Sequence, residues 1–138
     1  MRWAAGARTD EGRIALLVLV LAFAVLVMIG LAVDGGGKMR AMQRADNIAA
    51  EAARAAGQAI EPSQAIPGGP KVVNPGQAVA AGQDYLRAAG VTGTVAPSGD
   101  RRQVVVTVTI DYDTVILGLV GFDRLTVTGT ATAQLLTG

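Results

Sequence analysis

The chain has 138 residues, a formal net charge of +1, and neither cysteine nor histidine. These absences exclude thiol nucleophiles, disulfides, the commonest metal ligand and the commonest general acid or base. The few charges are spread along the chain, so the electrostatic footprint of a nucleic-acid-binding protein is missing. We expect no enzymatic activity, cofactor, bound metal, nucleic-acid partner or small-molecule substrate.

An uncharged apolar run from Ile14 to Val33 dominates the amino-terminal part of the chain. As a helix it would be roughly 30 Å long, which matches the hydrocarbon thickness of a bilayer. A cleaved signal usually has a shorter apolar region and a small-x-small cleavage site, which Leu31-Ala32-Val33-Asp34 does not provide. A core helix of a soluble protein would need a polar face. The run predicts a single transmembrane helix over residues 14–33.

Residues 1–13 form a short leader, which we expect to lie in the cytoplasm of a bacterial cell. Three basic residues stand on each side of the span, so counting them does not decide its orientation: Arg2, Arg8 and Arg13 before it, and Lys38, Arg40 and Arg44 after it. A short head has little to translocate, whereas a long domain crosses largely regardless of charge. We therefore expect the amino terminus inside and the domain outside.

Three consecutive glycines, Gly35, Gly36 and Gly37, follow the span. Each costs about 1 kcal/mol in a helix relative to alanine, so we expect a hinge, either a bend or a softened helix. Helical periodicity returns from Lys38 to Ala59, with an apolar side made mostly of alanine. The pattern predicts an amphipathic segment over residues 34–61 that continues from the span. Its alanine face suits packing on the chain's own sheet or against neighbouring subunits.

Residues 62–138 are expected to form a small extracytoplasmic α+β domain. After a loop with a short strand at 71–73, Asn74-Pro75 has the pattern of a helix start, and Gly90 is placed to end that helix. The apolar period then changes to two, over 91–95, 104–112 and 125–135. Strict alternation predicts an antiparallel sheet with one face buried under helices and the other wet.

The segment between the last two strands is apolar where polar turn residues are usual. Its large side chains are candidates for contact with a partner: Ile116, Leu117, Leu119, Val120 and Phe122. A crossover that fills the core would need no function. An exposed patch would mark contact with a partner or with the bilayer surface.

Three acidic residues are candidates for a site. Asp111 and Asp113 share a strand face, but a calcium site needs some six or more oxygen ligands and no neighbouring loop supplies them. Both are expected to face solvent, so a catalytic pair with divergent pKa values is not expected either. Asp34, at the end of the span, is expected to be an interfacial residue or a helix end.

The chain resembles the TadE/TadG-like minor pilins, or pseudopilins, of the Tad (Flp) pilus assembly machinery. The matching features are the leader ending in Glu11-Gly12, the apolar helix, its exit at residues 30–36, and the helix from Met42 to Arg54. The strand over residues 125–133 is a looser match. The resemblance covers roughly residues 8–60 well.

The resemblance implies a single-pass membrane protein whose apolar helix packs beside other pilin helices and whose extracytoplasmic domain caps or initiates a pilus. Processed members are cleaved after a glycine, with a glutamate five residues later. Cleavage after Gly12 would put Leu17 at that position, whereas cleavage after Gly6 would put Glu11 there but with charged residues where apolar ones belong. Both depart from the pattern, which leaves the cleaved and uncleaved forms as alternatives and suits a minor or assembly role. The alternative interpretation is a membrane-anchored extracytoplasmic binding module unrelated to pili.

Overall fold

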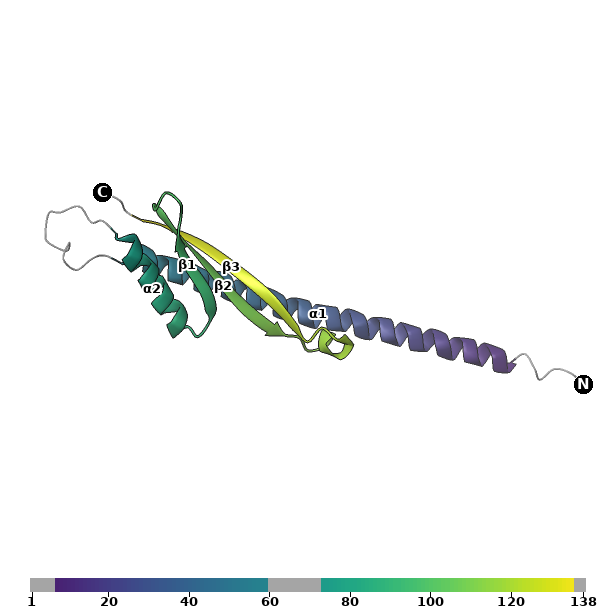
Figure 1. The fold of residues 1–138 in the computed structure, drawn as a ribbon. Coiled ribbons are helices and arrows are strands. Elements are labelled where there is room, and N and C mark those ends of the chain that lie inside the picture. Colours follow the sequence, from purple (N-terminus) through teal and green to yellow (C-terminus); the bar gives the residue numbers. More distant parts are fainter. Residues whose placement is uncertain (1–6, 60–72, 136–138) are drawn as a thin grey trace, which may run out of the picture.

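The structure, a computed structural model of the chain, describes residues 7–59 and 73–135. One long helix, a second short helix and a three-stranded antiparallel sheet make an α+β fold, as the sequence predicted (Figure 1). The strand predicted at 71–73 lies outside the described residues except for Val73, which is buried.

Helix α1 runs from Ala7 to Gly57 without interruption. At 1.5 Å per residue, its 51 residues extend for roughly 75 Å. Its first half projects away from the sheet, whereas its second half lies along it (Figure 1). The three glycines at 35–37 are helical and do not end α1. Helix α1 is neither broken nor bent at these residues. The predicted hinge therefore stays a prediction that the helix is softer at this point.

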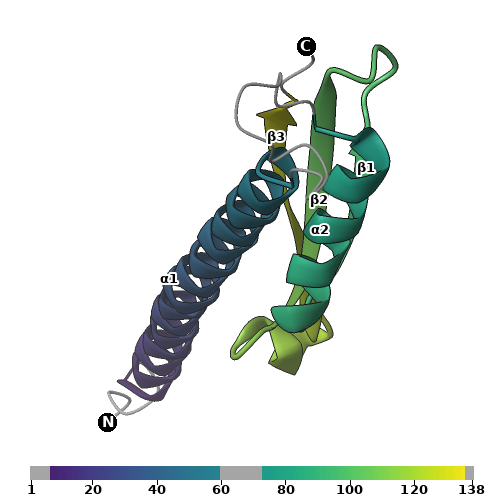
Figure 2. The same ribbon diagram turned by 90° about the vertical axis from the view of Figure 1, so that its left-hand side faces the viewer.

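The sheet has the order β1-β2-β3, with β1 at Thr92–Pro97, β2 at Gln103–Asp113 and β3 at Arg124–Gln134. Val106 of β2 pairs with Val95 on one side and with Ala131 on the other. Helix α2, at Pro75–Ala88, shares one face of the sheet with the second half of α1 (Figure 2). The predicted arrangement of one covered face and one wet face is confirmed.

The ends of α2 are set by local sequence. The Asn74 side chain accepts a hydrogen bond from the Gly76 N–H at 2.9 Å, and Pro75 occupies the first turn, where its missing N–H costs nothing. At the other end, Gly90 takes a φ of +66°, which glycine adopts without a steric penalty. Both predicted boundaries are confirmed.

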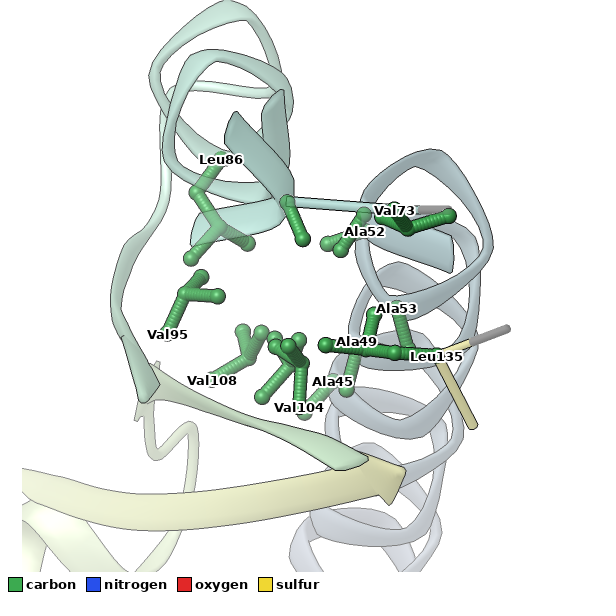
Figure 3. Close-up of a cluster of buried hydrophobic side chains, with 13 residues drawn as sticks. Ala45, Ala49, Ala52, Ala53, Val73, Leu86, Val95, Val104, Val108 and Leu135 are labelled. Atoms are coloured by element: carbon green, nitrogen blue, oxygen red, sulfur yellow. The ribbon is translucent and has the colours of Figure 1, made fainter. Parts of the chain in front are cut away.

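The core lies between the two helices and the sheet (Figure 3). Val104, Val106 and Val108 of β2 are fully buried, and Leu86 of α2 is 2% exposed. Each such side chain contributes about 1.5–3 kcal/mol of hydrophobic stabilisation. The contribution of α1 is a stripe of small side chains, all buried: Ala45, Ala49, Ala52, Ala53 and Ala56. The alanine face of α1 therefore packs on the chain's own sheet, which was one of the two alternatives.

Small residues on both sides let α1 approach the sheet closely. A Cβ built on Gly129 of β3 would lie 2.3 Å from the backbone carbon of Ala45 and 2.4 Å from the amide nitrogen of Asp46. Backbone cannot move aside as a flexible side chain can. The distance between α1 and β3 is thus limited by glycine at this point.

We expect Gly129→Ala to lower the free energy of unfolding by about 1–3 kcal/mol, because overpacking forces the helix and strand apart. Chemical denaturation in detergent micelles measures the change. Gly99→Ala is the matched control, since a Cβ at Gly99 meets nothing within 4 Å. Equal stability of the two variants would contradict the proposed limit on the spacing.

Candidate functional site

Among the described residues, one helix is long and apolar enough to cross a membrane, with a mean hydropathy of 3.2 in its most apolar window. Within residues 14–33, all the large apolar side chains are exposed, from Val33 at 42% to Met28 at 70%. Gly30 is the one buried position in this range. The outer surface of this half of α1 is therefore almost entirely hydrocarbon.

Asp34, the first charged residue after this range, is fully buried. Its Oδ1 accepts hydrogen bonds from the Val115 N–H at 2.7 Å and from the Tyr112 hydroxyl at 3.3 Å. Its Oδ2 accepts from the N–H groups of Ile116 at 2.9 Å and Leu117 at 2.7 Å. Three consecutive backbone N–H groups thus converge on one carboxylate, an arrangement suited to binding an anion.

These N–H groups lie at the start of η2, a short 3₁₀ helix at Leu117–Val120 between β2 and β3. No side chain of the η2 segment itself caps this helix. Asp34 supplies the missing acceptor from α1, some eighty residues earlier in the chain. The first half of α1 is thereby tied to the end of the β2–β3 hairpin.

The protonation state of Asp34 follows from these contacts. Burial raises the pKa of the carboxyl group, but the N–H groups of Leu117, Val115 and Ile116 and the Tyr112 hydroxyl outweigh it, so the pKa lies below its ordinary value. Burial also raises the pKa of Tyr112, and the nearby negative charge of Asp34 adds to that rise. At neutral pH the pair is a carboxylate and a neutral phenol.

Two glycines on the same face of α1 make room for this contact. A Cβ on Gly30 would lie 2.4 Å from Ile116 Cγ2, and a Cβ on Gly37 would lie 2.0 Å from the Tyr112 hydroxyl. Gly35 and Gly36 have nothing within 4 Å of such an atom. Gly30, Asp34 and Gly37 therefore act together, with small residues one turn before and one turn after the acid.

The segment of residues 115–122, which we call the apolar tip, is mostly exposed. The exposed fraction is 62% for Val115, 83% for Leu119, 66% for Val120 and 63% for Phe122. Ile116 and Leu117 are half-buried beside α1. Of the two predicted alternatives, the structure supports an exposed patch over a crossover that fills the core.

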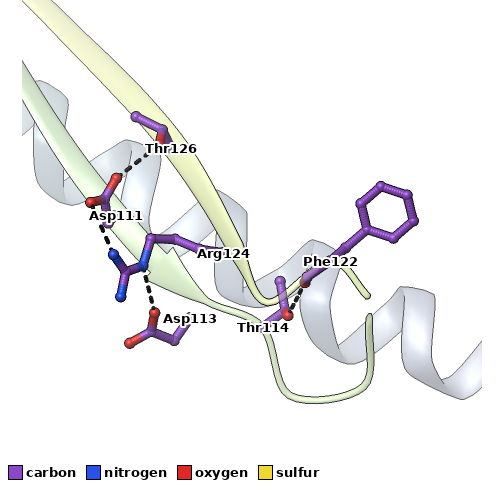
Figure 4. Close-up of polar contacts among 6 residues, drawn as sticks. All are labelled: Asp111, Asp113, Thr114, Phe122, Arg124 and Thr126. Atoms are coloured by element: carbon purple, nitrogen blue, oxygen red, sulfur yellow. Dashed lines mark hydrogen bonds and ion pairs between the residues drawn. The ribbon is translucent and has the colours of Figure 1, made fainter. Parts of the chain in front are cut away.

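Asp111 and Asp113 lie on the wet face beside Arg124 (Figure 4). Arg124 Nε donates to Asp113 Oδ1 at 3.0 Å, its Nη1 is 4.0 Å from Asp111 Oδ2, and the Thr126 hydroxyl donates to Asp111 at 2.8 Å. Both aspartates point to solvent, as predicted. Their observed partners are a cation and a hydroxyl, and within residues 7–59 and 73–135 no cluster of three His, Cys, Asp or Glu side chains is placed to hold a metal ion.

The sequence predicts Asp34 as an interfacial residue or a helix end, but Asp34 lies inside α1 and is fully buried by the β2–β3 loop. Its partners lie in a distant loop, and no local pattern identifies them. The one available signal was the placement of Gly30 and Gly37 around an acid on one helical face, which is typical of a close approach by another segment.

Residues 12–59 match the family model described as a putative Flp pilus-assembly TadE/G-like family. This confirms the resemblance over that range. No curated protein and no solved structure gives a significant match to the chain. The matched segment contains the apolar helix, Asp34 and the alanine stripe, and it supports a Tad-pilus-related subunit that is anchored in a membrane. The sheet and the apolar tip lie outside the match.

We expect Asp34→Asn to lower the melting temperature by several degrees at pH 7, because an amide cannot accept from all four donors and carries no charge. The folded-state pKa of Asp34 is lowered, so its stabilising effect is complete above the unfolded value of about 3.9. That effect disappears as the pH falls through the folded-state value. Circular dichroism melts of the two proteins should therefore converge in acid.

The control for this experiment is Asp123→Asn, which changes an exposed acid of the same hairpin. It should leave the melting temperature nearly unchanged. A melting temperature for Asp34→Asn as high as that of the Asp123→Asn control at pH 7 would show that the Asp34 contacts do not hold the loop.

Neighbouring glycines offer a second matched pair. Gly36→Ala should raise the free energy of unfolding by about 0.5–1 kcal/mol, because alanine restricts the unfolded chain and favours helix. Gly37→Ala should lower it by about 1–3 kcal/mol, because its Cβ displaces the Tyr112 ring. Denaturant titration of both variants measures the difference, and the opposite order would mean that Tyr112 does not pack on Gly37.

Proposed function

We propose that this chain is a minor pilin, or pseudopilin, of a Tad-type pilus, and that it acts by packing its membrane helix against other subunits. Residues 14–33 cross the bacterial cytoplasmic membrane, the amino terminus stays inside, and the domain lies outside. The observation that carries the proposal is the family match over residues 12–59. The exposed hydrocarbon surface of the same helix supports the membrane span.

The two halves of α1 differ in what they contact, and this difference supports helix packing through the span. From Ala45 to Ala56 the alanine stripe is buried in the chain's own core. That face is therefore occupied and cannot receive a second subunit without unfolding the domain. The first half of α1 is exposed on nearly all sides and offers neighbouring helices an apolar surface that the domain does not occupy.

A minor role rather than that of a major subunit is supported by the leader. With Leu17 five residues after Gly12, the expected glutamate is missing. A pilus subunit lacking that carboxylate cannot pair it with a neighbouring amino terminus. Retention of the leader is part of this proposal, and the intact mass of the purified protein distinguishes retention from cleavage after Gly12.

Single-cysteine cross-linking in cells tests the packing surface, because the chain contains no cysteine of its own. We expect Ala22→Cys, in the middle of the span, to form cross-links to other pilus subunits. Ala49→Cys lies on the same helix but is fully buried against the sheet, so it should form none. Mass spectrometry of the products identifies the partners.

Two outcomes would overturn the proposed function. One is the absence of cross-links from Ala22→Cys and from every other position of the span. The other is unchanged pilus production in cells that lack this chain. Activity of a carboxyl-terminal reporter in the cytoplasm would show that the proposed orientation is wrong, and it would leave the rest of the proposal standing.

A further inference from the structure

The apolar tip lies at the level where the span would leave the lipid. Ile116 sits against Gly30, three residues before the end of the apolar run at Val33. Three residues of helix are about 5 Å, so this contact falls just inside the hydrocarbon boundary. Segments that lie in a membrane interface bury their apolar side chains by about 5–10 Å. The position of the apolar tip matches that range.

Polar groups surround the apolar tip where a headgroup layer would be. At the neck of the hairpin, Arg124 bonds to Asp113, and the ring of Phe122 projects away from that pair (Figure 4). On α1, Lys38 and Arg40 follow Asp34 by about 6 and 9 Å along the helix axis. Residues 115–122 themselves carry no charge. Apolar side chains below a charged band are typical of an interfacial segment.

The backbone of the apolar tip is already hydrogen-bonded within the chain. Entry into lipid is costly for any N–H group that lacks a partner. Asp34 accepts from three of these groups, at Val115, Ile116 and Leu117. Carbonyl groups of the tip itself accept from three more, at Leu119, Gly121 and Phe122. The loop can therefore leave water with six of its N–H groups satisfied.

We propose that the apolar tip inserts into the lipid leaflet on the domain's side of the membrane, and that Asp34 holds it at that depth. The inference rests on the proposed span at residues 14–33. Lipid is the occupant that the geometry favours, because Leu119, Val120 and Phe122 are exposed in the same short segment whose Ile116 contacts the span at Gly30. A neighbouring subunit would cover one side of the tip, whereas lipid already surrounds the helix to which it is bound.

Tryptophan quenching by brominated lipids tests the depth of the tip in the full chain, reconstituted at low density in phosphatidylcholine–phosphatidylglycerol vesicles. The single native tryptophan, Trp3, is replaced by phenylalanine. Leu119→Trp reports on the tip, Phe23→Trp on the middle of the span, and Thr132→Trp on an exposed position of β3 far from the tip.

Leu119→Trp should lose most emission to lipids brominated near the headgroup end of the acyl chain, and Phe23→Trp to lipids brominated deeper. Thr132→Trp should lose none. If Phe23→Trp is quenched and Leu119→Trp is not, the inserted tip is wrong and the span stands. If neither is quenched, both proposals fall. Emission from Leu119→Trp that lipid does not quench, and that shows a buried tryptophan only at high protein density, would mean that a second copy covers the tip. That result also overturns the inference.

Discussion

The contact between the Asp34 carboxylate and the start of η2 holds the end of the β2–β3 hairpin against the long helix. A buried carboxylate is unfavourable unless charged hydrogen bonds replace its water. Here four donors do so, three of them consecutive backbone N–H groups. Because Tyr112 lies at the end of β2 and the three N–H groups lie in the loop that follows, the contact also fixes where the end of the hairpin lies along α1.

The rest of the helix–sheet interface depends on small residues. The alanine stripe of α1 presents little side-chain volume, and Gly129 presents none, so helix and strand approach until backbone meets backbone. The large side chains come from the opposite elements, with valines on β2 and Leu86 on α2. A helix with small side chains on one face can continue straight from an apolar span into a protein core, without a bend at the boundary.

The local features of this fold could be predicted from the sequence. The Asn74 cap and the Gly90 terminator act through neighbouring residues, and the alternation of β2 and β3 reflects one buried and one wet face. The antiparallel α+β arrangement and the helix boundaries of α2 follow from those signals. The apolar helix and its family resemblance are also evident from composition and motif alone, and the family match bears out the latter for residues 12–59.

The contacts that join distant segments could not be predicted in the same way. Three glycines in a row favour a break by intrinsic propensity, yet α1 continues, because Gly37 is covered by Tyr112 and the helix is held on both sides of the glycines. Asp34 has no local partner, so propensity and periodicity place it at a boundary and say nothing of the loop it binds. The position of the apolar tip depends on its contact with Asp34, so the sequence alone is compatible with both a buried and an exposed tip.

Helix α1 contacts the domain on both sides of the three glycines, at Asp34 before them and along the alanine stripe after them, and the Asp34 contact has a mechanical consequence. If the helix moves along the membrane normal as it joins other helices, the β2–β3 hairpin must move with it. The reason is that Ile116 is held by α1 twice, through its N–H to Asp34 and through its side chain against Gly30. A helix free to swivel at the glycines would lose this coupling. The stability of the Asp34 contact, more than the softness of the glycines, decides whether packing in the bilayer is transmitted to the sheet outside it.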